Sequence, residues 1–250
     1  MKKPAFRDHF SSSSPAYAQF RPRYPQALYD WIASEAPATM RVWDCATGTG
    51  QAAIDLAARF THVVASDASR AQLASAVSHP RVRYVQSTAE AAGLASASVD
   101  AVVVAQAVHW FDMPAFFREA ARVGRPSALV AVWTYGNLRL PPEIESLFVP
   151  FYEEVVGPYW PPERELIVGG YVDVPMPFAR VEPPRLAMDT SMTMAGLEGY
   201  IGTWSATQRY REALGHDPVP GFMASVAEVW GDPASAKPAA WPLTIIAGRV

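Results

Sequence analysis

Short runs of β-branched and apolar residues alternate with alanine-rich stretches between residues 41 and 135, and this alternation limits the fold more than any other feature. Five such runs occur, at 41–45, 62–66, 82–86, 99–105 and 128–133. The intervening stretches, such as "GQAAIDLAARF" and "MPAFFREAARVG", have the apolar spacing of helices. Strands that alternate with helices form a parallel sheet with helices on both faces. The sequence therefore predicts an α/β, doubly wound, mostly parallel sheet.

The segments outside this alternation complete a single predicted domain, 1–250. "PQALYDWIASEA" predicts a helix near the amino terminus, and "WPLTIIAGRV" predicts a closing strand. Residues 136–192 are rich in proline and predict an irregular insertion or lid. "MAGLEGYIGTWSATQRYREALG" is interpreted as one further helical stretch.

Composition and charge exclude several classes of protein. The net charge is −3 and no run of lysine and arginine occurs, so a nucleic-acid partner is not expected. No apolar run approaches the length of a membrane span, so no membrane partner is expected. The single cysteine, Cys45, excludes an internal disulfide and is consistent with a cytoplasmic location.

The stretch "VWDCATGTGQAA", residues 42–53, predicts a strand, a glycine turn and the start of a helix. In a doubly wound sheet, ligands bind outside the carboxyl ends of the strands. The spacing of Gly48, Gly50 and Ala53 fits a loose dinucleotide fingerprint, so the turn alone does not exclude NAD. Asp44 suits a ligand that carries an ammonium or a sulfonium. Asp67, at the end of the second strand, is positioned to accept the hydroxyls of a ribose.

These motifs, followed in order by "ASDAS" and "VRYVQSTAEAAGLASASVDAVVVAQAVHWFD" and preceded by "YAQFRPRYP", resemble the class I S-adenosylmethionine-dependent methyltransferases. The chain is most similar to the small-molecule group that includes trans-aconitate methyltransferase-like proteins, and the resemblance covers nearly its whole length. It implies a Rossmann-like, seven-stranded sheet, S-adenosylmethionine as the cofactor and a small-molecule acceptor. Ala46 stands where the family motif has a glycine. A negative φ at Ala46 would accommodate the methyl group.

The resemblance also implies a role for each matching residue. The methionyl part of the cofactor would lie against Asp44 and the backbone of Ala46, Gly48 and Gly50. The ribose and adenine would contact Asp67, Ala68, Ala89 and Glu90, and the sulfur would lie above Gln106 and Ala107. Residues 1–35 would form a flap over the cofactor, with Tyr17 excluding water and Arg21 binding the methionyl carboxylate.

The acceptor side would be formed by His109, Trp110, Trp204 and Gln208. On one helix Trp204, Gln208 and Arg211 would share a face, and an arginine there would suit an acidic acceptor. His109 is the candidate catalytic base. A carboxylate acceptor would need no base. No cluster of histidine and carboxylate side chains has the spacing of metal ligands, so no metal is expected.

Each of these assignments has a structural alternative. Asp44 and Asp67 could cap the helices that follow them, and Glu90 could be a solvated acid at a helix start. His109 could be a packed wall residue, and the helix with Arg211 could simply carry a solvated edge.

Transfer of a methyl group from S-adenosylmethionine to a small molecule is the function that these features favour. Two alternatives remain open: a binding protein of this fold that has lost activity, and an NAD(P)-dependent oxidoreductase. No Tyr-x-x-x-Lys dyad follows the fourth strand, which weighs against a short-chain oxidoreductase.

Overall fold

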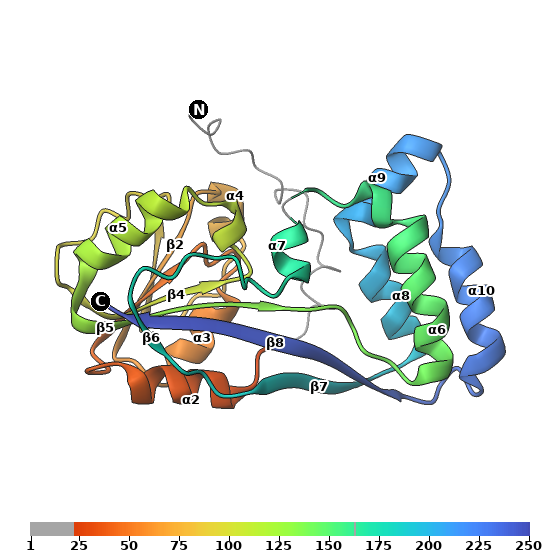
Figure 1. Cartoon of the computed structure of the whole chain (residues 1–250), viewed down its shortest axis with the longest axis horizontal. Coiled ribbons are helices and arrows are strands. Elements are labelled where there is room, and N and C mark those ends of the chain that lie inside the picture. The colour runs from red at the N-terminus through yellow and green to blue at the C-terminus, as the bar shows by residue number, and fades with distance from the viewer. Residues whose placement is uncertain (1–22, 163) are drawn as a thin grey trace.

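The computed structural model describes residues 23–162 and 164–250, which form one eight-stranded sheet flanked by helices (Figure 1). The strand order is β3-β2-β1-β4-β5-β8-β6, with β7 also paired to β8. The strands are β1 (Arg41–Cys45), β2 (His62–Asp67), β3 (Val82–Gln86), β4 (Val99–Ala105), β5 (Gly124–Tyr135), β6 (Ala179–Val181), β7 (Leu186–Met192) and β8 (Lys237–Arg249). Strands β1 to β5 pair in parallel, and β8 is antiparallel to its neighbours.

The helices lie on both faces of this sheet and beyond one end of it (Figure 1). They are α2 (Gln26–Glu35), α3 (Gln51–Leu56), α4 (Arg70–Ala74), α5 (Met113–Val123), α6 (Pro142–Pro150), α7 (Arg164–Val168), α8 (Met194–Gly202), α9 (Ser205–Leu214) and α10 (Val219–Trp230). Three short helical turns are η1 (Val108–Trp110), η2 (Phe151–Val155) and η3 (Gly157–Tyr159).

The α/β fold predicted from the alternating pattern is confirmed. Strands β1, β3 and β4 have the bounds that their apolar runs predict. The seven expected strand positions are present, but the last position is shared by two strands. Leu243 of β8 pairs with β5 on one edge and with β7 on the other, and Ala247 does the same with β5 and β6. Strands β6 and β7 therefore lie end to end along β8.

The proline-rich segment 136–192 is more regular than its composition predicts. It contains α6, η2, η3 and α7, and its last part supplies β6 and β7 to the sheet. The expectation of irregular structure there is wrong, because both strands gain their hydrogen bonds from β8, which is distant in the sequence.

The buried residues fall into two clusters, one on each face of the sheet, because successive strand residues point to opposite faces. One cluster joins Trp43 and Val104 to Phe116 of α5 and to Tyr171. The other joins Val42 and Val103 to α2, to α3 and to the helices beyond the sheet.

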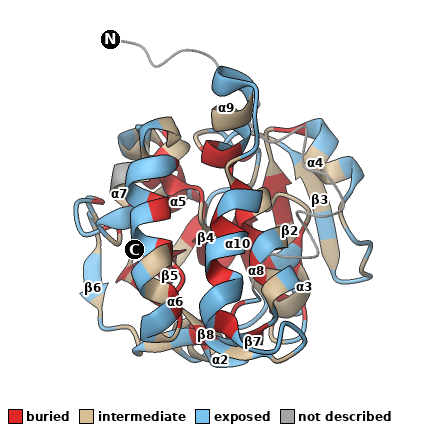
Figure 2. Cartoon of the chain, turned by 90° about the vertical axis from the view of Figure 1, so that its right-hand side faces the viewer, coloured by how far each residue is buried: buried red, intermediate tan, exposed pale blue. Residues whose placement is uncertain are grey.

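Helices α6, α8, α9 and α10 form a group at one end of the sheet, with buried residues facing inward and exposed residues outward (Figure 2). The long strand β8 reaches this group, and Trp241 donates a hydrogen bond to the hydroxyl of Tyr200 at 2.9 Å. The single helix expected over 194–215 is two helices, α8 and α9, separated at Thr203 and Trp204. Within the described part of the chain, no helix has the length and apolar character of a membrane span.

Candidate functional site

Four neighbouring parallel strands bring the predicted cofactor residues to one edge of the sheet. The segments after β1, β2, β3 and β4 carry Asp44 to Gly50, Asp67 to Ala68, Ala89 to Glu90 and Gln106 to Trp110. Strand β1 pairs with β2 on one side and β4 on the other, so the connections leave it in opposite directions. This is the topological switch point, where the ends of the strands leave a crevice for a ligand.

The carboxyl group of Asp44 is buried at this edge of the sheet, and one of its oxygens accepts no hydrogen bond from the described residues. The residue is only 1% exposed. Oδ2 accepts a hydrogen bond from Thr47 Oγ1 at 2.5 Å, whereas buried Oδ1 accepts none from the described residues. The pKa of Asp44 is raised to about 7, mainly by burial and in smaller part by the Asp67 charge, while hydrogen bonds from Thr47 and the Ala53 amide act to lower it. The N-cap of α3 is Gly50, but the backbone amide of Ala53, in the first turn of α3, also acts on the Asp44 carboxyl group. A buried acceptor without a donor fits a cationic ligand group.

In the turn after β1, every second residue has a positive φ, in the left-handed region of backbone conformation. Ala46 has φ +57°, Gly48 has φ +58° and Gly50 has φ +85°. The condition for accommodating the methyl group of Ala46, a negative φ, is therefore not met. An L-residue in this region costs roughly 1–2 kcal/mol relative to its ordinary conformation, which is the physical reason for a glycine here.

Replacing Ala46 by glycine should therefore stabilise the protein by about 0.5–1 kcal/mol, because relief of left-handed strain outweighs the added freedom of the unfolded chain. The fold and the donor affinity should be retained or improved. Chemical denaturation of both proteins measures the first effect, and calorimetry with S-adenosylmethionine measures the second. A less stable variant would show that the Ala46 methyl group makes a favourable contact in the turn.

Gly50 is held against the ring of Tyr84 on β3. A Cβ atom built on Gly50 would lie 2.2 Å from Tyr84 Oη and 2.9 Å from its Cζ. The Tyr84 hydroxyl donates to the carbonyl oxygen of Val77 at 2.8 Å, so the ring is fixed from its far end. The start of α3 can therefore approach β3 only because residue 50 has no side chain.

Gly93 offers a matched comparison, since it also has a left-handed φ of +68° but no atom within 4 Å of an added Cβ. Both Gly50→Ala and Gly93→Ala should lose stability through backbone strain, and the Gly50 variant should lose about 2 kcal/mol more through overpacking. Urea denaturation measures the difference. Equal losses would mean that Tyr84 moves aside freely.

Asp67 ties the glycine turn to the end of β2. Oδ2 accepts a hydrogen bond from the Gly48 amide and Oδ1 from the Ser69 amide, both at 2.8 Å. The N-cap of α4 is Ser69, which accepts from the Gln72 amide, so Asp67 is not the helix cap. A carboxylate at the end of this strand is also placed to accept hydrogen bonds from ribose hydroxyls. Ala68 follows directly at the same edge, partly exposed.

The segment after β3 carries Ala89, which is buried, and Glu90, which is partly exposed. Glu90 Oε1 accepts a hydrogen bond from the Asp112 amide at 3.0 Å. It therefore links this loop to the start of α5 and is not simply a solvated acid. Asp112 in turn caps α5 by accepting from the Ala115 amide at 3.1 Å.

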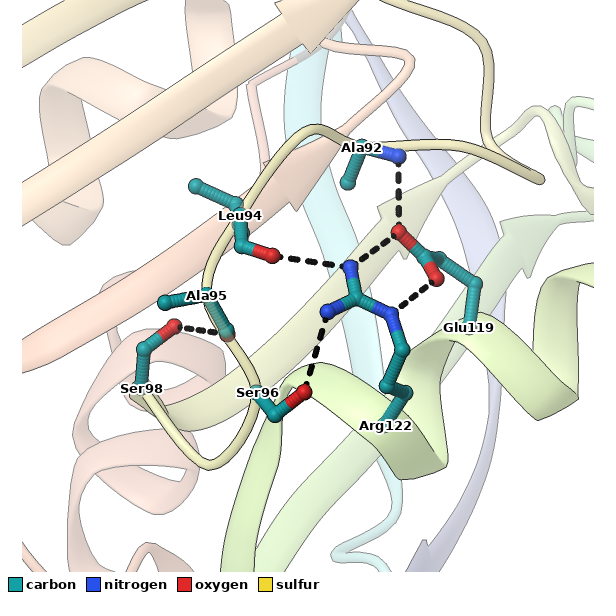
Figure 3. Close-up of polar contacts among 7 residues, drawn as sticks. All are labelled: Ala92, Leu94, Ala95, Ser96, Ser98, Glu119 and Arg122. Carbon is teal, nitrogen blue, oxygen red and sulfur yellow. Dashed lines mark hydrogen bonds and ion pairs between the residues drawn. The ribbon is translucent and has the colours of Figure 1, made fainter.

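An ion pair on α5 fixes the rest of this loop (Figure 3). Arg122 forms a two-pronged contact with Glu119, with both distances 2.7 Å, and donates to the Leu94 carbonyl oxygen at 2.8 Å. Glu119 also accepts from the Ala92 amide at 2.8 Å. The Arg122 hydrogen bonds lower the pKa of Glu119. These contacts hold residues 92–96 and so position Ala89 and Glu90 at the edge of the crevice.

Gln106 and Ala107 follow β4. Gln106 has φ +56°, an uncommon conformation for a residue with a side chain, and its amide donates to the Trp133 carbonyl oxygen at 2.9 Å. Its Oε1 accepts a hydrogen bond from Thr134 of β5 at 2.8 Å. The side chain of Ala107 is nearly buried. Backbone strain of this kind often marks a functional site.

His109 lies in η1, 4% exposed, beside Trp110 at 4.8 Å between ring centroids. Its Nδ1 is 2.7 Å from the hydroxyl oxygen of Tyr171, which lies 62 residues further along the chain. Burial raises the pKa of the Tyr171 phenol well above its usual value, while Thr134 and Arg164 act to lower it. The phenol therefore stays protonated and can orient the imidazole. The packed-wall alternative for His109 is compatible with this burial.

The residues predicted on the acceptor helix follow one another along α9, since the Gln208 amide donates to the Trp204 carbonyl oxygen at 3.1 Å, but their burial differs. Trp204 is buried in an aromatic group with Phe148, Tyr152 and Trp160. Gln208 is exposed, so the two do not share a buried face. Arg211 forms an ion pair with Asp217 at 2.8 Å, so its positive charge is compensated within the protein.

Tyr17 and Arg21 lie outside the described residues, as does most of the flap expected over 1–35; its described part includes helix α2. Among the residues that the structure does describe, no group of three histidine, cysteine or carboxylate side chains is placed to hold a metal ion.

Several neighbours of the site were missed from the sequence: Thr134, Asn137, Tyr152, Arg164 and Tyr171. All come from β5 or from the segment that was expected to be irregular. One signal was available, since Tyr171 follows the paired glycines 169–170, which are typical of a turn. Their meeting with His109 depends on tertiary packing.

Comparison with known proteins identifies the family. A family model described as a methyltransferase domain matches residues 43–132. A Dictyostelium discoideum protein assigned as a methyltransferase is 33% identical over 229 residues, covering 90% of this chain and 87% of the relative. A solved structure from Anaeromyxobacter dehalogenans, assigned as a type II methyltransferase, is 41% identical with a TM-score of 0.88, covering 92% of this chain and 97% of that one.

A Saccharomyces cerevisiae protein assigned as an S-adenosylmethionine-dependent methyltransferase is 28% identical over 128 residues, covering 48% of this chain and 44% of the relative. The chain belongs to the class I S-adenosylmethionine-dependent methyltransferases. It is an enzyme whose methyl donor is S-adenosylmethionine, and this replaces the NAD(P)-dependent and inactive alternatives.

The geometry of the crevice fits this donor. The buried, unmatched Oδ1 of Asp44 suits the methionyl ammonium, and the glycine turn lets the backbone come close to the ligand. Asp67, at the end of β2, is placed to accept hydrogen bonds from the ribose.

Proposed function

We propose that the enzyme methylates a small-molecule acceptor, bound between the carboxyl edge of the sheet and the helices beyond it. The observation that carries this proposal is the 2.7 Å contact between His109 and Tyr171. It joins the turn after β4 to the segment that follows α7. An acceptor site closed by buried side chains suits a small molecule better than a protein or nucleic-acid surface.

When bound, S-adenosylmethionine supplies a methyl group already activated on a sulfonium, so the protein's task is to position the acceptor and exclude water. Asp44, the turn 46–50 and Asp67 would hold the donor. Gln106 and Ala107 would border the reacting side. His109, kept in place by Tyr171, would contact the nucleophilic atom of the acceptor and take its proton where the acceptor carries one.

A cytoplasmic location belongs to this proposal as well. It rests on the single cysteine, which is buried in β1.

The test is a transfer assay with methyl-labelled S-adenosylmethionine and a cell extract separated into metabolites, protein and nucleic acid. Label should enter the metabolite fraction. A variant with Asp44 replaced by asparagine serves as the donor-deficient control. Label in protein or nucleic acid would contradict the small-molecule assignment, as would donor binding with no transfer to any fraction.

A further inference from the structure

Arg164, the first residue of α7, is held by neutral groups from two other elements. Its Nη2 donates to Asn137 Oδ1 at 3.2 Å, and its Nε donates to the hydroxyl of Tyr152 at 3.1 Å. Asn137 follows the carboxyl end of β5, next to β4 in the sheet. Helix α7 lies between the strands and the helix group (Figure 1). The guanidinium is thus anchored beside the reacting edge.

Aromatic faces support the same cation. The guanidinium carbon lies 4.4 Å from the ring centroid of Trp160 and 5.8 Å from that of Tyr152. The indole nitrogen of Trp160 is buried and has no hydrogen-bond acceptor among the described residues. A cation and an unmatched donor therefore lie together, a combination that an anionic ligand would satisfy.

Among the side chains that the structure describes, Arg164 differs from several other arginines in its partners, which are neutral. Six arginines of the described chain form ion pairs, including Arg211 with Asp217 and Arg125 with Asp100. Among the side chains that the structure describes, none places a carboxylate within 4.0 Å of Arg164. Partly burying a charge is costly unless an opposite charge or strong hydrogen bonds compensate for it. Neutral partners orient this guanidinium but do not neutralise it.

Arg164 is also close to the His109 pair. Its positive charge acts on the phenol of Tyr171, whose hydroxyl contacts His109 Nδ1. Seven residues separate Arg164 from Tyr171, and the chain between them turns through Gly170 at φ +64°. An anion on Arg164 would therefore lie in the same site as the acceptor.

We propose that Arg164 binds a carboxylate group of the methyl acceptor, with Trp160 and Tyr152 packing against an apolar or aromatic body. This inference rests on the proposed function and deepens it, because it names the acceptor class as organic acids. Arg164 holds the anion by paired hydrogen bonds, as a planar guanidinium does with a carboxylate. It takes no part in the transfer itself.

The test compares acids with neutral molecules of the same shape: phenylacetate with phenylacetamide, hexanoate with hexanamide, and adipate with adipamide. Calorimetry in saturating S-adenosylhomocysteine measures binding, and methyl-labelled donor measures transfer. At least one acid should bind, and its amide should bind much more weakly. Arg164→Gln should weaken acid binding about 10–100-fold, the range for a lost charge-assisted hydrogen bond. Arg164→Lys should restore part of it.

Arg211→Gln is the matched control, because it removes an arginine of the helix group whose charge is already paired. It should leave acid binding unchanged, and all three variants should bind S-adenosylhomocysteine like the parent. Failure of every acid to bind at millimolar concentration would overturn the inference, as would equal binding of acids and amides or unchanged binding in Arg164→Gln. Labelling of neutral metabolites alone would overturn it and leave the proposed function intact. Acid binding without transfer either to the acids or to any metabolite of the extract would instead contradict the proposed function.

Discussion

Replacing Asp44 by asparagine is expected to make the donor-free protein more stable at pH 8 while weakening S-adenosylmethionine binding about 100-fold. Asp44 is buried and its Oδ1 has no donor among the described residues, so the ionised form is destabilised in the empty site. Asparagine removes that charge and should stabilise the protein by about 1–2 kcal/mol at this pH, after the cost of its unmatched amide. The donor's ammonium loses its charged partner, which weakens binding by about 3 kcal/mol.

The pH dependence follows from the direction of the shift. Between about pH 4 and pH 7, folded Asp44 keeps a proton that the unfolded chain has lost, because its pKa is raised to about 7. Unfolding then releases a proton, so the free energy of unfolding contributed by this group falls as pH rises and is level above pH 7. Donor affinity should change in the opposite direction, rising through pH 7 as the carboxylate forms. Both slopes should be absent in Asp44→Asn.

Asp100 provides the control, since it is also fully buried on a neighbouring strand but has its donors. It accepts hydrogen bonds from the Met40 and Arg41 amides and pairs with Arg125 at 2.6 Å. Asp100→Asn should lose about 3 kcal/mol of stability and keep donor affinity. Denaturation and calorimetry at pH 5.5 and pH 8 measure both variants. If Asp44→Asn behaved like Asp100→Asn, Asp44 would be a structural residue.

Replacing His109 by alanine should lower turnover by roughly 10²–10⁴-fold with donor affinity unchanged. The imidazole is buried after β4, beside Gln106 and Ala107, and its loss would leave the acceptor without its contact to the protein on that side. Tyr171→Phe should show a smaller loss, about 10-fold, because it removes the hydroxyl that orients His109 but keeps the ring.

The measurements are steady-state rates from pH 5.5 to 9 on an acceptor found by the transfer assay, with donor calorimetry on each variant. A fall in rate at low pH that disappears in His109→Ala would assign the role of base. Parallel profiles would assign positioning, as expected for a carboxylate that is already ionised. A His109→Asn variant with most of its turnover would contradict the base assignment, and full activity in His109→Ala would remove His109 from the site.

The mostly parallel, doubly wound sheet and the edge at which its ligand crevice lies could be predicted from the sequence. Strands β1, β3 and β4 are buried or half-buried and rich in apolar residues, so their bounds could be predicted from the local sequence. The two aspartates at strand ends and the glycine turn between them follow directly, because parallel strands present their carboxyl ends at one edge. This is why Asp44, Gly50 and Asp67 were found without a structure.

Other features depend on contacts that no local pattern records. Strands β6 and β7 form because β8 offers them a free edge, although prolines surround them in the sequence. The left-handed φ of Ala46 belongs to the turn into α3, and the sequence stated only the condition, a negative φ, that this residue does not meet. The burial along the acceptor helix also depends on such contacts, since Gln208 is exposed while Trp204 packs into the aromatic group.

The sequence by itself determined the class of fold, the donor and the carboxylates at the ends of β1 and β2, because those properties reside in short continuous motifs. Only the tertiary structure decided which residues lie around His109 and Arg164. Tyr171 reaches His109 and Arg164 reaches Asn137 across 62 and 27 residues of chain, respectively. These pairs form because α7 packs between the sheet and the helix group. A hydrogen bond between side chains so far apart in the chain produces no periodic pattern in the sequence.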